Sequence, residues 1–217
     1  MTTAQYIELF ANAEKWGNQY LFTPPKYRQR ARFSFVTSSK FINDQSIGLL
    51  KGTAMSNDAL RLAMMNRAGY TCLQSSNYVV RYLPRVLNTV GILTVGYMNH
   101  KGRSWYYFDK NRVLTWVKRP GSIVTENGIN LHVWITLQSG EIVDLVGAAG
   151  IATELYKSEE DYEKGVDMVK NPFIGTVESL SQARRVKYFP LGVGRHFLLK
   201  IGLPKHAFQL NSVLFNA

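Results

Sequence analysis

The pattern of hydrophobic and polar positions predicts helices in the first third of the chain and strands in the middle. Apolar side chains recur at helical spacing over residues 2–17, where Thr2 and Gln5 fit a capping box and Gly17 is a suitable stop. Residues 56–67 show the same spacing after a serine cap and predict a second helix.

A third helix is predicted to begin at Cys72, which is the only cysteine in the chain. Thr71 and Gln74 fit a second capping box, with Thr71 as the N-cap. Helical spacing then continues as far as Leu83, and Pro84 is expected to end or kink the helix there. The sequence therefore predicts that Cys72 lies in the first turn of a helix.

The middle of the chain consists of short apolar runs separated by turn residues, which is typical of strands. Strands are predicted over residues 32–36, 93–98, 104–108, 113–117, 131–137 and 142–146, with one or two more in 186–189 and 197–203. Residues 37–55 are expected to be irregular, and a further helix is predicted over 159–169. This order predicts an α+β fold in which helices lie on one side of an antiparallel sheet.

A histidine and a carboxylate lie on a predicted hairpin. Alternation over residues 131–137 puts the aliphatic side chains on a core face and His132 on the opposite face, with Trp134 beside it to shape a site. If the loop consists of the three residues 138–140, Trp134 pairs with Asp144, and Asp144 joins the face of His132. A loop of two residues would put Asp144 on the other face.

Cys72, His132 and Asp144 have the chemistry of a cysteine nucleophile, its base and an orienting carboxylate. The thiolate is the reactive form of cysteine, and the positive end of a helix dipole favours it. His132 would take the Cys72 proton, or hold it in an imidazolium–thiolate pair, and Asp144 would orient the imidazole. The alternatives are a cysteine packed as a small hydrophobic residue, a half-buried strand histidine and a surface carboxylate on a hairpin.

A thioester mechanism also needs donors for an oxyanion. The backbone N–H of Cys72 is the natural first donor, and Asn66 is our candidate for the second, with Gln45 and Asn57 as alternatives. We expect no cofactor and no metal site, because a single cysteine gives little basis for a ligand set. The remaining histidines have no evident partner: His100, His196 and His206.

These residues resemble the papain-like fold in its transglutaminase-like branch. The branch has a cysteine at a helix start, a Gly-Ile that leads into a strand ending in Gly and an aromatic residue, then His-x-Trp and an Asp on the next strand. The corresponding residues here are Cys72, residues 91–97, His132 with Trp134, and Asp144. The resemblance covers about residues 66–147 and implies a Cys-His-Asp acyl-transfer site. The expected partner is a protein or peptide substrate.

Two features of the branch are missing. There is no tryptophan near Asp144, and no tryptophan or similar polar group before Cys72. The spacing from His132 to Asp144 also resembles the bacterial cell-wall cysteine endopeptidases of the same fold, in which the third member is often a histidine. Peptidase, amidase, deamidase and cross-linking transferase activities therefore all stay open.

The formal charge of +11 indicates attraction to something anionic. The competing functional hypothesis is therefore a non-catalytic basic module that binds nucleic acid or an anionic surface. Its aromatic residues for stacking on bases would be Trp105, Tyr106, Tyr107 and Trp116. The basic residues are scattered apart from local clusters in 26–32 and 184–187.

Length and composition fit one domain. The 217 residues are 46% hydrophobic, and no apolar run reaches the roughly 18 residues of a membrane-spanning helix. We expect a single catalytic domain over residues 1–217, with an N-terminal part (1–55), a Cys/His/Asp core (56–147) and a C-terminal part (148–217). The first ten residues show no secretory signal, so a cytoplasmic location is expected. Signal-independent export, and with it a bacterial effector role, stays open.

Overall fold

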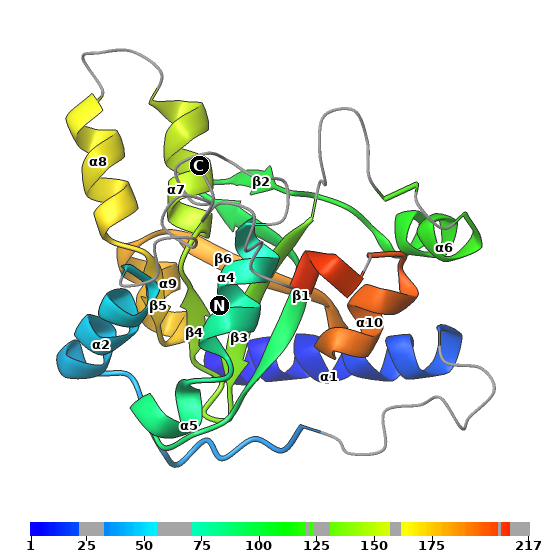
Figure 1. Cartoon of the computed structure of the whole chain (residues 1–217), viewed down its shortest axis with the longest axis horizontal. Helices are drawn as coiled ribbons and strands as arrows, with labels where there is room; N and C mark the ends of the chain where they lie inside the picture. The colour runs from blue at the N-terminus through cyan, green and yellow to red at the C-terminus, as the bar shows by residue number, and fades with distance from the viewer. Residues whose placement is uncertain are drawn as a thin grey trace.

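The computed structural model describes residues 1–21, 33–55, 71–119, 122–123, 131–156, 162–203 and 205–208. Within them, helices surround one antiparallel sheet (Figure 1). The helices are α1 (Thr3–Tyr20), α2 (Asp44–Met55), α4 (Thr71–Val79), α5 (Leu83–Val86), α6 (Lys110–Lys118), α7 (Gly147–Leu155), α8 (Tyr162–Lys170), α9 (Val177–Ala183), α10 (Gly194–Lys200) and the short 3₁₀ helix η3 (Lys205–Phe208). The strands are β1 (Gly91–His100), β2 (Arg103–Trp105), β3 (His132–Leu137), β4 (Ile142–Asp144), β5 (Phe173–Gly175) and β6 (Val186–Val193).

Strand β1 organises the sheet. Its residues 91–96 pair with β3, and its residues 94–100 pair with β6 on the opposite edge. Strand β2 pairs with residues 98–100 of β1 and so continues the edge that β3 occupies. Strand β4 pairs with β3, and β5 pairs with β4. Both strands of the candidate hairpin, β3 and β4, therefore lie inside the sheet.

Both faces of the sheet are covered. Every residue of β3 is buried. Val133 and Ile135 pack on one face in a cluster with residues of α4, α6 and α10. Trp134 packs on the other face with Tyr6 of α1 and Ile151 of α7. The prediction of helices on one side only is therefore wrong, because the face that carries Trp134 is also buried and needs its own cover.

The predicted first helix and its capping box are confirmed. The Thr2 hydroxyl accepts a hydrogen bond from the Gln5 N–H, and the Gln5 side chain accepts one from the Thr2 N–H. The helix continues three residues beyond Gly17, because Gly17 is buried inside it and faces Phe197. The residue expected to end the helix instead allows a close approach to α10.

In the segment 33–55 the predicted strand and the predicted irregular stretch are both wrong. Residues 33–36 form no strand, and α2 occupies most of the part expected to be irregular. Asn43 precedes α2, and its side chain accepts a hydrogen bond from the Ser46 N–H at 2.8 Å, as an N-cap residue does. The predicted helix over 56–67 lies outside the described residues.

Two predicted strands are helices. Residues 113–117 belong to α6, which begins after the Asp109 cap, and α10 covers most of the apolar run 197–203. In α6 the buried residues are Val113 and Trp116, three positions apart, which is a helical spacing. A short apolar run fits either a strand or a helix, and here the Asp109 N-cap favours the helix.

The remaining predictions agree with the structure in outline. Helix α4 ends at Val79, before Pro84, which lies in the first turn of the separate helix α5. Strands β1, β3, β4 and the first half of β6 match predicted strands, and α8 matches the predicted helix at 159–169. Helices α7 and α9 and strand β5 were not predicted. No helix among the described residues is long and apolar enough to span a membrane.

Candidate active site

The β3–β4 hairpin has the predicted register. Ile135 lies opposite Val143, and the Leu137 N–H donates to the Glu141 carbonyl at 2.9 Å across the loop. Residues 138–140 therefore form the three-residue loop, and Gly140 takes the left-handed conformation with φ of 84°. The next step of this register puts Asp144 opposite Trp134, on the face of His132.

His132 and Asp144 are in direct contact. The imidazole Nε2 lies 2.7 Å from Asp144 Oδ2, and both residues are buried, with exposed fractions of 1% and 0%. A hydrogen bond this short between two buried ionisable groups is charge-assisted. The sequence therefore predicted this pair correctly from alternation and loop length.

Asp144 is held by three further donors. The Tyr188 hydroxyl donates to Oδ2 at 2.7 Å, and the backbone N–H groups of Val146 and Gly147 donate to Oδ1 at 3.3 and 2.8 Å. Burial raises the pKa of Asp144, but the His132 charge and these hydrogen bonds outweigh it, so the pKa lies below the usual value. The carboxylate is therefore ionised in the folded protein at neutral pH.

For His132, burial and the neighbouring charge also have opposing effects on the pKa, with signs opposite to those for Asp144. Burial lowers the pKa of His132, but the charge of Asp144 and hydrogen bonds to Asp144 and Cys72 outweigh it and raise the pKa to about 10. The favoured form at neutral pH is thus an imidazolium paired with a carboxylate.

Cys72 reaches this pair from α4. Its sulfur lies 3.9 Å from the Leu131 carbonyl, and the Ser76 hydroxyl donates to the Val133 carbonyl at 3.2 Å. Cys72 and Ser76 are one turn apart, so the two contacts fix α4 along the first residues of β3, and Cys72 comes beside His132. Cys72 is half-buried, and its side chain lies close enough to the imidazole to help raise the pKa of His132. Thr71 is already a residue of α4, so the prediction that it is the N-cap of this helix is wrong.

Aromatic rings enclose the imidazole. Tyr106 stacks on His132 with ring centroids 5.0 Å apart and planes at 15°, and Trp134 stacks with centroids 5.9 Å apart. Tyr106 has a φ of 58°, an unusual conformation for a bulky side chain. Gly150 allows this placement, because a Cβ there would lie 2.0 Å from the Tyr106 hydroxyl oxygen. Tyr106 therefore helps to separate His132 from solvent.

A buried chain of hydrogen bonds fixes Trp134. Its indole N–H donates to the Tyr6 hydroxyl at 2.8 Å, and that hydroxyl lies 2.6 Å from the hydroxyl of Thr136. Thr136 is in turn 2.7 Å from Thr94 on β1. Burial raises the pKa of Tyr6, so its hydroxyl stays protonated. The tryptophan that the sequence placed beside His132 is therefore locked in position by α1 and β1.

Of the predicted oxyanion donors, the backbone N–H of Cys72 belongs to the second residue of α4. Asn66 and Asn57 lie outside the described residues, and Gln45 is exposed on α2. Of the other histidines, His100 is the last residue of β1 and is buried, and burial together with Lys101 and Arg184 lowers its pKa. Within the described ranges, no group of three or more His, Cys, Asp or Glu side chains could hold a metal ion.

Sequence reasoning missed Tyr188 and Tyr106. Tyr188 comes from β6, which pairs with β1 and not with the hairpin, so no local spacing links it to Asp144. Tyr106 lies in a predicted strand, and only its left-handed backbone turns the ring onto His132. A Val-x-Tyr alternation at Val186 and Tyr188 was the available signal that Tyr188 faces inward.

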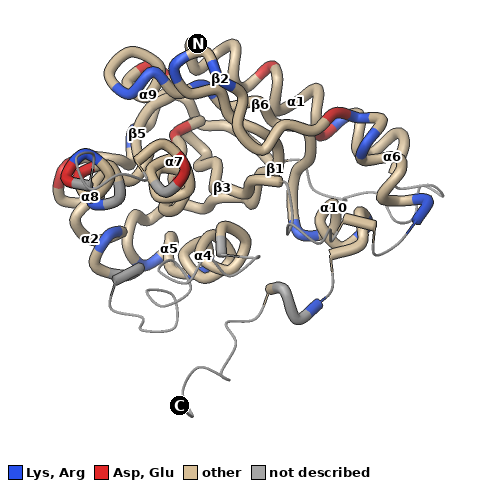
Figure 2. The backbone as a smooth tube through the Cα atoms, turned by 90° about the horizontal axis from the view of Figure 1, so that it is seen from above, with Lys and Arg blue, Asp and Glu red and all other residues tan. Residues whose placement is uncertain are grey.

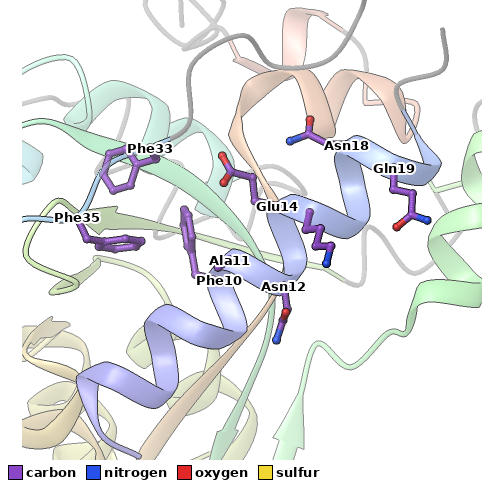
Figure 3. Close-up of a pocket in the computed structure, with 9 residues that line it drawn as sticks. Phe10, Ala11, Asn12, Glu14, Asn18, Gln19, Phe33 and Phe35 are labelled. Atoms are coloured by element: carbon purple, nitrogen blue, oxygen red, sulfur yellow. The ribbon is translucent and has the colours of Figure 1, made fainter. Parts of the chain in front are cut away.

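Two hollows among the described residues lie along α1 and are lined by none of Cys72, His132 and Asp144. One, of about 620 Å³, is lined by the Phe10, Phe33 and Phe35 rings and by polar residues of α1 (Figure 3). The other, of about 780 Å³, lies between α1, α9 and the segment before α2. Neither is lined by Cys72, His132 or Asp144, so the imidazole–carboxylate pair does not open into a preformed pocket there.

Comparison of the chain with protein-family models, with curated proteins and with solved structures gave no match.

Proposed function

We propose that the protein is a cysteine-dependent enzyme that breaks an amide bond by acyl transfer, in the manner of the papain-like and transglutaminase-like proteins that its sequence resembles. Cys72 is the nucleophile, His132 carries the proton and Asp144 orients the imidazole. One observation carries this proposal: the side chain of the only cysteine in the sequence lies beside the buried His132–Asp144 pair, whose hydrogen bond is 2.7 Å long.

We infer that Cys72 and His132 rest as a thiolate–imidazolium pair, and the raised pKa of His132 supports the imidazolium half of this pair. The sulfur of Cys72 attacks the carbonyl carbon of the amide. The C–N bond breaks as the leaving nitrogen takes the proton from His132, and a thioester remains on Cys72. Water or an amine then attacks the thioester carbon, gives its proton to His132 and releases the thiolate.

The charge of His132 is stable in this scheme because Asp144 stays ionised through the cycle. Tyr188 and the backbone N–H groups of Val146 and Gly147 hold its two oxygens. The imidazole face is covered by Tyr106, which keeps the ion pair away from water and strengthens its electrostatic attraction.

Alkylation of the single thiol tests the proposal. At pH 6 we expect iodoacetamide to react with Cys72 about tenfold faster than with N-acetylcysteine, because an imidazolium favours the thiolate. His132→Asn should remove the advantage. His196→Asn, which changes an exposed histidine on α10, is the matched control and should retain it. Mass spectrometry of the intact protein gives the rate, and a wild-type rate no faster than that of N-acetylcysteine rejects an activated nucleophile.

The alternative of a non-catalytic base-stacking module is less well supported. Trp105 and Trp116 are 5% and 3% exposed and pack in the two clusters that cover the sheet. Tyr106 is stacked on His132. Among the four candidate stacking residues only Tyr107, at 56%, is mostly exposed. The net charge of +11 is then better explained by attraction of an anionic substrate to the enzyme.

A further inference from the structure

Three aromatic rings lie together on the outer part of the sheet. Tyr97 of β1 stacks on Phe189 of β6, with centroids 4.9 Å apart and planes at 10°. Tyr107 meets Tyr97 edge-on at 4.9 Å. Tyr97 and Phe189 are half-buried, and Tyr107 is 56% exposed. This aromatic trio is apolar surface within reach of solvent.

The aromatic trio adjoins the candidate active site. Gly96 lies opposite His132 in the β1–β3 ladder, so Tyr97, the next residue of β1, points to the other face of the sheet, on which Val95 and Cys72 pack. Cys72 contacts the carbonyl of Leu131, which directly precedes His132. A chain bound at Cys72 that runs along this face of the sheet therefore meets the trio first.

Basic side chains continue the same face. Phe189 lies opposite Tyr97, and Lys187, two residues earlier in β6, lies opposite Asn99. Two residues along a strand are separated by about 7 Å, so Lys187 follows the aromatic trio at that spacing. An extended peptide bound alongside has the same repeat and can present one side chain to the rings and another to Lys187.

Two exposed basic residues at neighbouring turns add to the charge. Lys101 and Arg185 both have a φ of 52°, and the Lys101 N–H donates to the Arg185 carbonyl at 3.0 Å. Asn or Gly is the usual residue where φ is positive, so the backbone conformation does not explain the basic residue at either turn. Figure 2 shows Lys and Arg segments gathered near β2 and α9, where these turns lie.

These cations lack acidic partners within the described part of the chain. No ion pair joins Lys101, Arg185 or Lys187 to a carboxylate there. Arg103, which pairs with Glu154, extends to the other face of the sheet over the Trp105 ring. The three cations are thus available to an external anion.

We propose that the aromatic trio, Lys187, Lys101 and Arg185 form a recognition surface for an acidic polypeptide, with an aromatic or large apolar residue for the trio and Glu or Asp side chains for the cations. The inference rests on the proposed function, because it takes the bound chain to be the substrate of Cys72. A single-stranded nucleic acid fits less well. Phe189 already stacks on one face of the Tyr97 ring, and Tyr107 packs edge-on against the same ring, whereas bases need free ring faces.

The test uses the full chain with Cys72→Ala, so that binding is measured without turnover. The probe is a dye-labelled peptide of seven residues with Phe and Glu two positions apart and a second Glu after it. The comparison peptide has Gln in place of both Glu residues. Fluorescence anisotropy at 50 and 150 mM salt gives the dissociation constants.

We expect the Glu peptide to bind about tenfold more tightly than the Gln peptide, and Lys187→Glu to weaken it about fivefold. Lys118→Glu makes the same charge change on α6 and should have little effect. Tyr107→Ala should also weaken binding, whereas Tyr20→Ala, at 54% exposure on α1, should not.

Equal weakening by Lys187→Glu and Lys118→Glu, or equal binding of the two peptides, overturns the proposal. Tighter binding of a twelve-residue oligothymidylate that Lys187→Glu abolishes overturns it in favour of nucleic acid. Peptide binding is independent of Cys72 reactivity, so a failure of the alkylation test with intact peptide discrimination would reject the enzyme and keep the surface.

Discussion

At the scale of single residues, the position of Asp144 is the best-determined feature of the site. His132 and Tyr188 both contact Oδ2, while the N–H groups of Val146 and Gly147 contact Oδ1. Four contacts on two oxygens leave the carboxylate no alternative rotamer without a lost hydrogen bond. Its orientation, and through it that of the imidazole, is therefore set by the chain that follows β4.

Gly147 is required by this arrangement. A Cβ at this position would lie 2.1 Å from Asp144 Oδ2, and the carboxylate is not free to move away. We expect Gly147→Ala to lower the free energy of unfolding by about 2 kcal/mol and to slow alkylation of Cys72, because Asp144 must leave His132. Urea denaturation and the iodoacetamide rate measure the two effects.

Gly48 provides the control for this substitution. It lies within α2, and a Cβ there would contact nothing within 4 Å. Gly48→Ala should leave alkylation unchanged and stabilise the protein by about 0.5–1 kcal/mol, since alanine is the better helix former. If Gly147→Ala behaves like Gly48→Ala, Asp144 is less constrained than its contacts indicate.

At the scale of elements, the β3–β4 hairpin determines whether a site exists. The side-chain period of a strand is two, so one additional loop residue turns Asp144 away from His132 if the pairing follows it. Residues 138–140 hold the register through the Leu137–Glu141 hydrogen bond and the positive φ of Gly140. Glu141 reinforces the loop, because its buried carboxylate accepts hydrogen bonds from Ser139 and from the N–H groups of Phe41 and Ile42.

A glycine inserted after Gly140 tests the hairpin. We expect the variant to lose the rate advantage of Cys72 over N-acetylcysteine at pH 6, because the His132–Asp144 contact needs the three-residue loop. A glycine inserted after Arg119, an exposed residue that follows α6, is the control and should leave the rate unchanged. Cooperative unfolding in urea verifies that both variants fold. Retained reactivity in the first variant would show that the loop does not set the site.

The hairpin was predictable from sequence because its signals are local. Alternation gave the face of His132, and Gly140 gave the loop length. The runs 113–117 and 197–203 were predicted as strands, since five to seven apolar residues fit either structure until a cap or a packing partner decides. Tyr188 and Tyr106 reach the site through β6 and through a strained turn, and no local spacing links either residue to His132 or Asp144. The hydrophobic periodicity of a single sequence shows neither which distant strands pair nor where the backbone is strained.

At the scale of the whole molecule, the buried ion pair couples stability to pH. The folded pKa of His132, about 10, lies above its ordinary value of 6.5, so its stabilising contribution is complete below pH 6.5 and is lost as pH rises to about 10. The pKa of Asp144 is lowered from 3.8, so its contribution is complete above that pH and is lost in more acidic solution. Only between about pH 4 and 6.5 do His132 and Asp144 both contribute their full stabilisation of the folded protein.

The double variant His132→Asn, Asp144→Asn isolates this coupling. The free energy of unfolding of the wild type minus that of the variant should be most favourable between about pH 4 and 6.5 and should decline on both sides. Urea titrations from pH 3 to 10 give the curve. A difference that does not change with pH would mean that the pair is not ionised in the folded protein.

Tyr106 has a consequence for affinity as well as for shielding. Its left-handed backbone costs about 1–3 kcal/mol, and in the proposed enzyme its ring would have to leave His132 before a large substrate contacts the imidazole. The measured dissociation constant of such a substrate equals its intrinsic value divided by the fraction of molecules in which the ring has moved. A scan of substitutions at residue 106 should therefore change apparent affinity through the occupancy of two conformers, with no change in the contacts that the substrate makes.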